Sequence, residues 1–99
     1  MLNLYIVRPH HAISRCSYEE NLKIRQEITE KVSSYLEEPV TLLPQIEIEK
    51  GNLLLHLSRV IEKISCADVV YFSYGWKDHR EESILHEIAK QYGKIIIEV

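Results

Sequence analysis

The alternation of strand-like and helix-like segments is the feature that most constrains the fold of this chain. Four short apolar segments rich in Val, Ile, Leu and Tyr cover residues 2–7, 40–43, 68–73 and 95–99. Segments with apolar residues at helical spacing separate them, at residues 17–36, 53–64 and 80–92. Strands that alternate with helices predict a parallel sheet with right-handed crossovers. We therefore predict an α/β, Rossmann-like three-layer sandwich, β-α-β-α-β-α-β, with a four-stranded parallel sheet in the order 2-1-3-4.

Local signals set the ends of the predicted helices. Ser17 followed by Glu20 fits a capping box, so the first helix is expected to begin there. Pro39 ends that helix, and Gly93 provides a C-terminal cap for the last one. Residues 45–52, which carry Glu47, Glu49 and Lys50, are predicted to form a loop.

Length and charge limit the classes of protein to which the chain can belong. Its 99 residues are predicted to form a single domain, residues 1–99. The net charge of −3 argues against general nucleic-acid binding and against binding to anionic membranes. No apolar run approaches the roughly 20 residues that span a bilayer, and the first residues do not resemble a secretory signal. We expect a cytoplasmic protein.

Cysteine and histidine spacing gives no support for a metal centre. Cys16 and Cys66 lack CxxC spacing, and we expect two reduced thiols; a disulfide or a reactive thiol is the alternative. Four histidines suggest a metal site, but no HxH, HExxH or Cys/His motif supports one: His10, His11, His79 and His86. We therefore predict neither a metal nor a cofactor, and we expect His56 to be structural.

Two predicted loops concentrate unusual side chains at one edge of the sheet. In an open parallel sheet, ligands bind at the carboxyl ends of the strands where the strand order reverses, here between the first and third strands. The loops at that point are residues 8–16 and 74–80. They carry Arg8, His10, His11 and Arg15, and Tyr74, Trp76, Asp78, His79 and Arg80. A ligand site is predicted at this edge.

Trp76 and Arg80 each allow a second interpretation. Trp76 either stacks on a base or sugar, or covers the end of the sheet as a packing residue. Arg80 is either solvated or pairs with an anion, because a cation at a helix N-terminus opposes the helix dipole.

Several short motifs follow one another along nearly the whole chain. Their residues are Tyr5, Ile6, Pro9, Ala67, Asp68, Gly75, Trp76, Ala89, Gly93 and Lys94. The order of these motifs resembles the nucleoside 2-deoxyribosyltransferase-like family, which includes small phage and bacterial proteins of unknown function. Members typically have Tyr-Ile-Ala-Gly-Pro in the first strand, Ala-Asp before the third strand, then Gly-Trp, and a helix that ends in Ala and Gly.

The resemblance implies a nucleoside or nucleotide at the predicted edge, and a helix glutamate that attacks the anomeric carbon of the sugar. Here that position is Leu85, which is not a nucleophile. Glu82, one turn earlier, is the preferred substitute, and Glu87 is the other. Arg8 replaces the glycine of the first motif, and His79, beside Asp78, falls where an acidic residue is expected.

Three functions follow as hypotheses. The first is a nucleoside- or nucleotide-binding domain with altered or lost transferase chemistry. In it, Arg8 and Arg80 hold a phosphate or ribose hydroxyls and Trp76 stacks on the base. The second is an active N-glycosidic enzyme that uses Glu82 or Glu87 as its catalytic residue. The third is a phage or bacterial protein-interaction module, because an aromatic and arginine cluster also suits an interface.

Under the first two hypotheses, the predicted substrate-binding residues are Tyr5, Arg8, Pro9, His10, Gly75, Trp76, Asp78, His79 and Arg80. A homo-oligomer, a dimer or higher, is expected under all three.

Overall fold

The computed structural model describes residues 1–46 and 51–98, and for His10 it describes the backbone alone. The predicted loop residues Glu47, Glu49 and Lys50, together with Val99, lie outside this part of the chain. Its elements, in chain order, are β1 (Leu2–Val7), α1 (His10–Ser14), α2 (Tyr18–Leu36), β2 (Val40–Leu42), α3 (Leu53–Cys66), β3 (Val69–Phe72), the short 3₁₀ helix η1 (Trp76–Asp78), α4 (Arg80–Gln91) and β4 (Ile95–Glu98).

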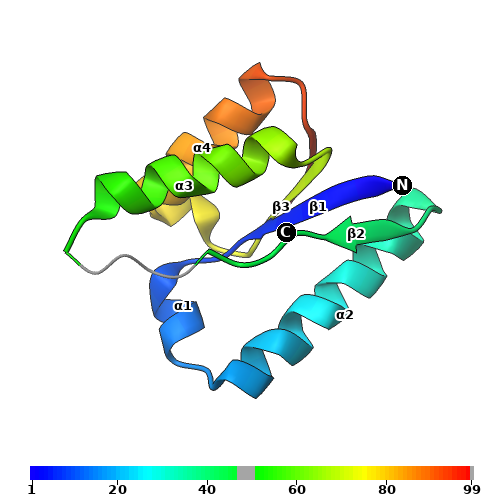
Figure 1. Ribbon diagram of the computed structural model, residues 1–99, viewed down its shortest axis with the longest axis horizontal. Helices are drawn as coiled ribbons and strands as arrows, with labels where there is room; N and C mark the ends of the chain where they lie inside the picture. The colour runs from blue at the N-terminus through cyan, green and yellow to red at the C-terminus, as the bar shows by residue number, and fades with distance from the viewer. Residues whose placement is uncertain (47–50, 99) are drawn as a thin grey trace.

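The four strands form one parallel sheet in the order β2-β1-β3-β4, as predicted from the sequence. β1 is central and pairs through Leu4 with both Leu42 and Val69. Helix α2 covers one face of the sheet, whereas α3 and α4 cover the other, so that the molecule has three layers (Figure 1). Strand order reverses at β1, whose carboxyl end lies beside α1 in Figure 1.

Alternate residues of β1 face the two helical layers. Tyr5 and Val7 belong to the core shared with α3 and α4, whereas Leu4 and Ile6 belong to the core shared with α2. All four are at most 4% exposed. Burying a large apolar side chain contributes roughly 1.5–3 kcal/mol, so β1 anchors both layers. A strand covered on both faces explains why residues 4–7 are all apolar.

Local signals in the sequence set both ends of α2. The Ser17 hydroxyl accepts a hydrogen bond from the Glu20 amide at 3.1 Å, and the Glu20 carboxylate accepts one from the Ser17 amide at 3.1 Å. This is the predicted capping box. At the other end, Glu37 adopts a left-handed backbone with φ 56°, and Pro39 follows two residues later.

Helix α1 was not predicted. The sequence indicated a polar loop after Pro9, but His10–Ser14 forms a helix whose first carbonyl acceptor is Pro9, with the Ala12 and Ile13 amides at 3.1 and 3.2 Å. Proline ends a strand because it lacks a backbone donor, but a helix start requires no donor there. The same residue therefore ends β1 and begins α1.

Within the described residues, no helix combines the length and the apolar character needed to cross a membrane.

Candidate functional site

Two cavities adjoin the buried side chain of Arg8 at the carboxyl end of β1. The larger one, here called the α2 cavity, has a volume of about 470 Å³. It lies between α2 and the segment after β2, and its walls are Arg8, Ile13, Tyr18, Asn21, Leu22, Arg25, Pro44, Gln45 and Ile46. The smaller one, the α4 cavity, has a volume of only about 20 Å³ and is lined by Arg8 and by residues that include Tyr5, His56 and Glu82.

Arg8 is held in place by a neutral partner. Its side chain is 8% exposed, and Nη1 donates to Asn21 Oδ1 at 2.9 Å. The amide nitrogen of Asn21 donates in turn to the carbonyls of Ile13 at 3.0 Å and Cys16 at 3.4 Å, which fixes the orientation of its oxygen. Within residues 1–46 and 51–98, no carboxylate lies within ion-pair distance of this guanidinium. The cation is therefore buried without a counter-charge from the described part of the protein.

Arg25 presents a second guanidinium to the α2 cavity. Its Nη2 donates to the Leu43 carbonyl at 2.8 Å, which ties α2 to the end of β2. Its Nε is fully buried and meets no acceptor among the described residues. Burial lowers the pKa of Arg25; the Tyr5 phenol opposes this shift, and the positive charge of Arg8 adds to it. The positive charge of Arg8 thus acts on Arg25, and both side chains line the α2 cavity.

Glu82 has a buried carboxylate that faces the α4 cavity. It lies in the first turn of α4 and is 5% exposed. Among the described residues it has no hydrogen-bond or ion-pair partner. A carboxylate on a largely buried residue with no described partner is a candidate functional group, because burial of an unpaired charge is unfavourable. The cavity in front of it has room for about one water molecule.

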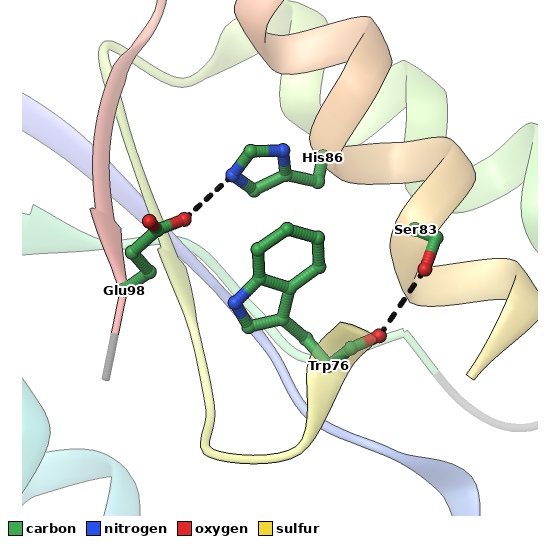
Figure 2. Close-up of polar contacts among 4 residues, drawn as sticks. All are labelled: Trp76, Ser83, His86 and Glu98. Atoms are coloured by element: carbon green, nitrogen blue, oxygen red, sulfur yellow. Dashed lines mark hydrogen bonds and ion pairs between the residues drawn. The ribbon is translucent and has the colours of Figure 1, made fainter. Parts of the chain in front are cut away.

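Trp76 packs against His86 of α4 (Figure 2). It is not among the residues that line either cavity. Its ring stacks on that of His86, with centroids 3.8 Å apart and planes 10° apart. His86 Nε2 lies 2.7 Å from Glu98 Oε2, and Ser83 Oγ donates to the Trp76 carbonyl at 3.4 Å. One face of the indole is thus already covered by an imidazole, as expected from the packing interpretation.

The remaining predicted site residues are spread around this edge of the sheet. Tyr5 is 2% exposed and lines the α4 cavity, where burial raises its pKa to about 12. Pro9 is buried at the start of α1, and His79 has its ring 5.0 Å from that of His11. The side chain of His10 lies outside the described part of the structure.

Three of the predicted site residues in the loop at residues 74–80 either allow an unusual backbone conformation or are exposed to solvent. Gly75 has φ 88°, a left-handed conformation that suits glycine, and it precedes η1. Asp78 and Arg80 are exposed. Glu87 is also exposed, and its Oε1 accepts a hydrogen bond from Gln91 at 2.9 Å. The structure therefore brings Arg8, Tyr5 and Glu82 to one cavity, and it places Trp76, Asp78 and Arg80 outside both.

Sequence reasoning missed Asn21, Arg25 and Glu98 as parts of this region, and it considered His86 only as a metal ligand. Asn21 and Arg25 are four residues apart on α2, so they share one helix face with the apolar Leu22. Two polar residues inside an apolar helix face are a signal that the sequence does contain. The contact between His86 and Glu98 joins a helix to the last strand, and no local pattern indicates it.

The described residues contain no group of three or more His, Cys, Asp or Glu side chains placed to hold a metal ion. Cys16 and Cys66 carry free thiols; the first is partly buried and the second exposed.

The fold and the site define the class as an open parallel α/β protein with a cavity beside β1, the strand at which the order reverses. Comparisons with protein-family models, with curated proteins and with solved structures gave no match. Membership of the nucleoside 2-deoxyribosyltransferase-like family stays a prediction from the motifs.

Proposed function

We propose that this chain is a nucleoside- or nucleotide-binding domain whose ligand occupies the α2 cavity. The observation that carries the proposal is the position of a cavity of about 470 Å³ at the carboxyl end of β1, where open parallel sheets bind their ligands. This volume falls in the range of about 300–1,000 Å³ that is typical of small-molecule sites. The motif resemblance supports a nucleoside as the class of ligand.

The walls of the α2 cavity suit an aromatic base attached to a polar sugar. Ile13, Leu22 and Pro44 provide an apolar surface, while Gln45 and Arg8 supply amide and guanidinium groups for hydroxyls and ring heteroatoms. Apolar walls with a few convergent polar groups are the usual composition of ligand sites. Tyr18, which is 81% exposed, stands at the rim and is available for stacking on the ligand.

Binding without transferase chemistry is the form of the proposal that the geometry favours. Leu85, at the position of the family nucleophile, is 4% exposed and belongs to the hydrophobic core. Glu82 faces the α4 cavity, which is too small for a sugar. A ligand in the α2 cavity therefore meets arginine and amide groups, and no carboxylate lines that cavity among the described residues.

A thermal-shift panel of nucleosides and nucleoside phosphates tests the proposal. A ligand at a hundred times its dissociation constant stabilises the folded state by about 2.7 kcal/mol, which raises the melting temperature. Leu22→Trp is designed to fill the α2 cavity from the helix and should abolish the shift. Leu53→Trp, at an exposed leucine outside both cavities, should retain it. No shift with any compound, for folded wild type, contradicts the proposal.

A second function, N-glycosidic cleavage by Glu82, is favoured by the burial of that carboxylate without a described partner. It requires the α4 cavity to open far enough to admit the sugar. The assay is release of free base from deoxynucleosides and deoxynucleotides. Glu82→Gln should abolish release, whereas Glu87→Gln, at an exposed position on the same helix, should not. No release by the wild type, or equal release by the wild type and Glu82→Gln, rules out this role of Glu82.

A further inference from the structure

We propose that the α2 cavity contains a phosphate subsite between Arg8 and Arg25, and that the ligand is therefore a nucleoside monophosphate rather than a free nucleoside. The nucleoside part of this statement rests on the proposed function. The anion subsite itself rests on the two arginines, and the experiment below separates the two.

Among the described residues, each of the two guanidiniums is anchored by one neutral acceptor and has further donors without a partner there. Arg8 donates to the Asn21 side chain at 2.9 Å, and Arg25 donates to the Leu43 carbonyl at 2.8 Å. A guanidinium has five N–H groups in a rigid planar fork, so each keeps further donors for a ligand. Because both side chains line one cavity, those donors can converge on one bound group.

The charged side chains that line the α2 cavity among the described residues are both positive, which favours the binding of an anion. The chain has 15 acidic residues, yet none of those in the described ranges lies within ion-pair distance of Arg8 or Arg25. Arg8 is 8% exposed, and Arg25 has a buried Nε without an acceptor in the described part of the chain. Two cations that face one cavity with no counter-charge among the described residues are unfavourable alone, whereas a bound anion removes this penalty for both.

A phosphomonoester fits the pair better than a carboxylate does. It carries a charge of about −1.5 to −2 at neutral pH, against −1 for a carboxylate, and its three terminal oxygens accept bidentate hydrogen bonds from arginine forks. A cavity of about 470 Å³ admits one small ligand, and the net charge of −3 disfavours a polyanionic strand. These two observations select a single nucleotide over nucleic acid.

The test is isothermal titration calorimetry of the full chain with three probes: nucleosides, the matching 5′-monophosphates and inorganic phosphate. We expect the wild type to bind a monophosphate at least 10-fold more tightly than its nucleoside. Arg25→Gln should weaken monophosphate binding about 10- to 100-fold, which is the value of a hydrogen-bonded charge, while leaving nucleoside binding unchanged. Lys23→Gln removes the same charge from an exposed position of α2 and should leave both affinities unchanged.

Arg25 also anchors α2 to Leu43, so folding of Arg25→Gln must be confirmed by circular dichroism and thermal unfolding. Arg25→Lys is the second variant, because it keeps the charge but loses the planar fork; we expect it to bind the monophosphate with an affinity between those of the wild type and Arg25→Gln.

The outcomes distinguish this inference from the proposed function. Equal affinity for nucleoside and monophosphate, insensitive to Arg25→Gln, overturns the phosphate subsite and leaves the proposed function in place. Inorganic phosphate that binds through Arg25, with no gain from an attached nucleoside, supports the subsite and overturns the nucleotide ligand. Absence of binding by all three probes to folded wild type overturns both.

Discussion

Trp76 lies face to face with His86, and this stack ties the 3₁₀ helix η1 to α4. The ring planes are 10° apart with centroids at 3.8 Å, and Phe72 packs edge-on against the same imidazole at 4.9 Å. His86 also meets Glu98 at the end of β4 at 2.7 Å (Figure 2). One imidazole thus connects the loop after β3, the following helix and the last strand.

Removing the imidazole should destabilise the protein without affecting the α2 cavity. His86→Ala is expected to lower the free energy of unfolding by about 1–2 kcal/mol, because aromatic pairs contribute about 0.5–1.5 kcal/mol beyond their buried area. His86→Phe keeps the stack and should recover most of that loss. Chemical denaturation measures both, and equal losses for the two variants would show that the ring contact is unimportant.

The capping box of α2 makes stability depend on pH in the acid range. Hydrogen bonds from the Ser17 backbone and side chain lower the pKa of Glu20 below its ordinary value. A carboxyl group whose pKa is depressed in the folded state stabilises that state above its unfolded pKa, and it loses this contribution as pH falls through the folded value. Stability should therefore decline below about pH 5.

Glu20→Gln tests this account, because glutamine keeps the capping geometry but does not titrate. The variant should show a shallower dependence of unfolding free energy on acid pH than the wild type. Ser17→Ala, which removes a partner of the carboxylate, should also flatten it. If the free energy of unfolding depends on acid pH as steeply in both variants as in the wild type, the capping box has no role in this pH dependence.

Tyr5 makes stability depend on pH in the alkaline range. Burial raises the pKa of Tyr5 to about 12, whereas hydrogen bonding to the Ile46 backbone and the charge of Arg25 act in the opposite direction. The folded state favours the neutral phenol, so stability is lost as pH rises from the unfolded pKa of about 10 towards 12. The loss attributable to this group approaches roughly 2–3 kcal/mol at the upper end.

Tyr5→Phe should reduce this alkaline loss while preserving the core packing of the ring. The measurement is the free energy of unfolding of both proteins between about pH 9 and about pH 11. Parallel curves for wild type and variant would contradict the pKa assigned to the folded state.

Self-association remains a prediction, and the sheet provides a specific place to test it. On the face that α2 covers, Ile95 of β4 is 43% exposed, and the neighbouring Tyr71 and Ile97 are only partly buried. We expect light scattering to show a dimer or higher oligomer that Ile95→Glu dissociates. Leu54→Glu, at a 77% exposed leucine on α3, should leave the assembly intact. A wild-type monomer across the concentration range would contradict the expectation.

The strand order and the capping box could be predicted because each leaves a local or periodic signal in the sequence. β1 is apolar at every position except Asn3, and Ser17 and Glu20 have the required spacing. Helix α1 was missed because residues 8–16 were predicted to form a loop, although a proline such as Pro9 is well suited to the start of a helix.

The candidate site stays a prediction. Arg8 was singled out from its position at the sheet edge and Glu82 from the family resemblance, and both line the α4 cavity in the structure. The larger cavity depends on Arg25, which lies within an amphipathic helix and is brought to Arg8 by packing of α2 on the sheet. The partner of Trp76 is ten residues away on another element, so only the fold reveals that contact.

The most direct test of nucleotide binding in the α2 cavity is a map of backbone amide chemical shifts during titration with a nucleoside 5′-monophosphate. The account predicts saturable changes that centre on Arg8, Asn21, Arg25 and Gln45. Ile61 and Ile88, which line a separate cavity between α3 and α4, should not change. Saturable changes that centre on Ile61 and Ile88, or no saturable change at all, would contradict it.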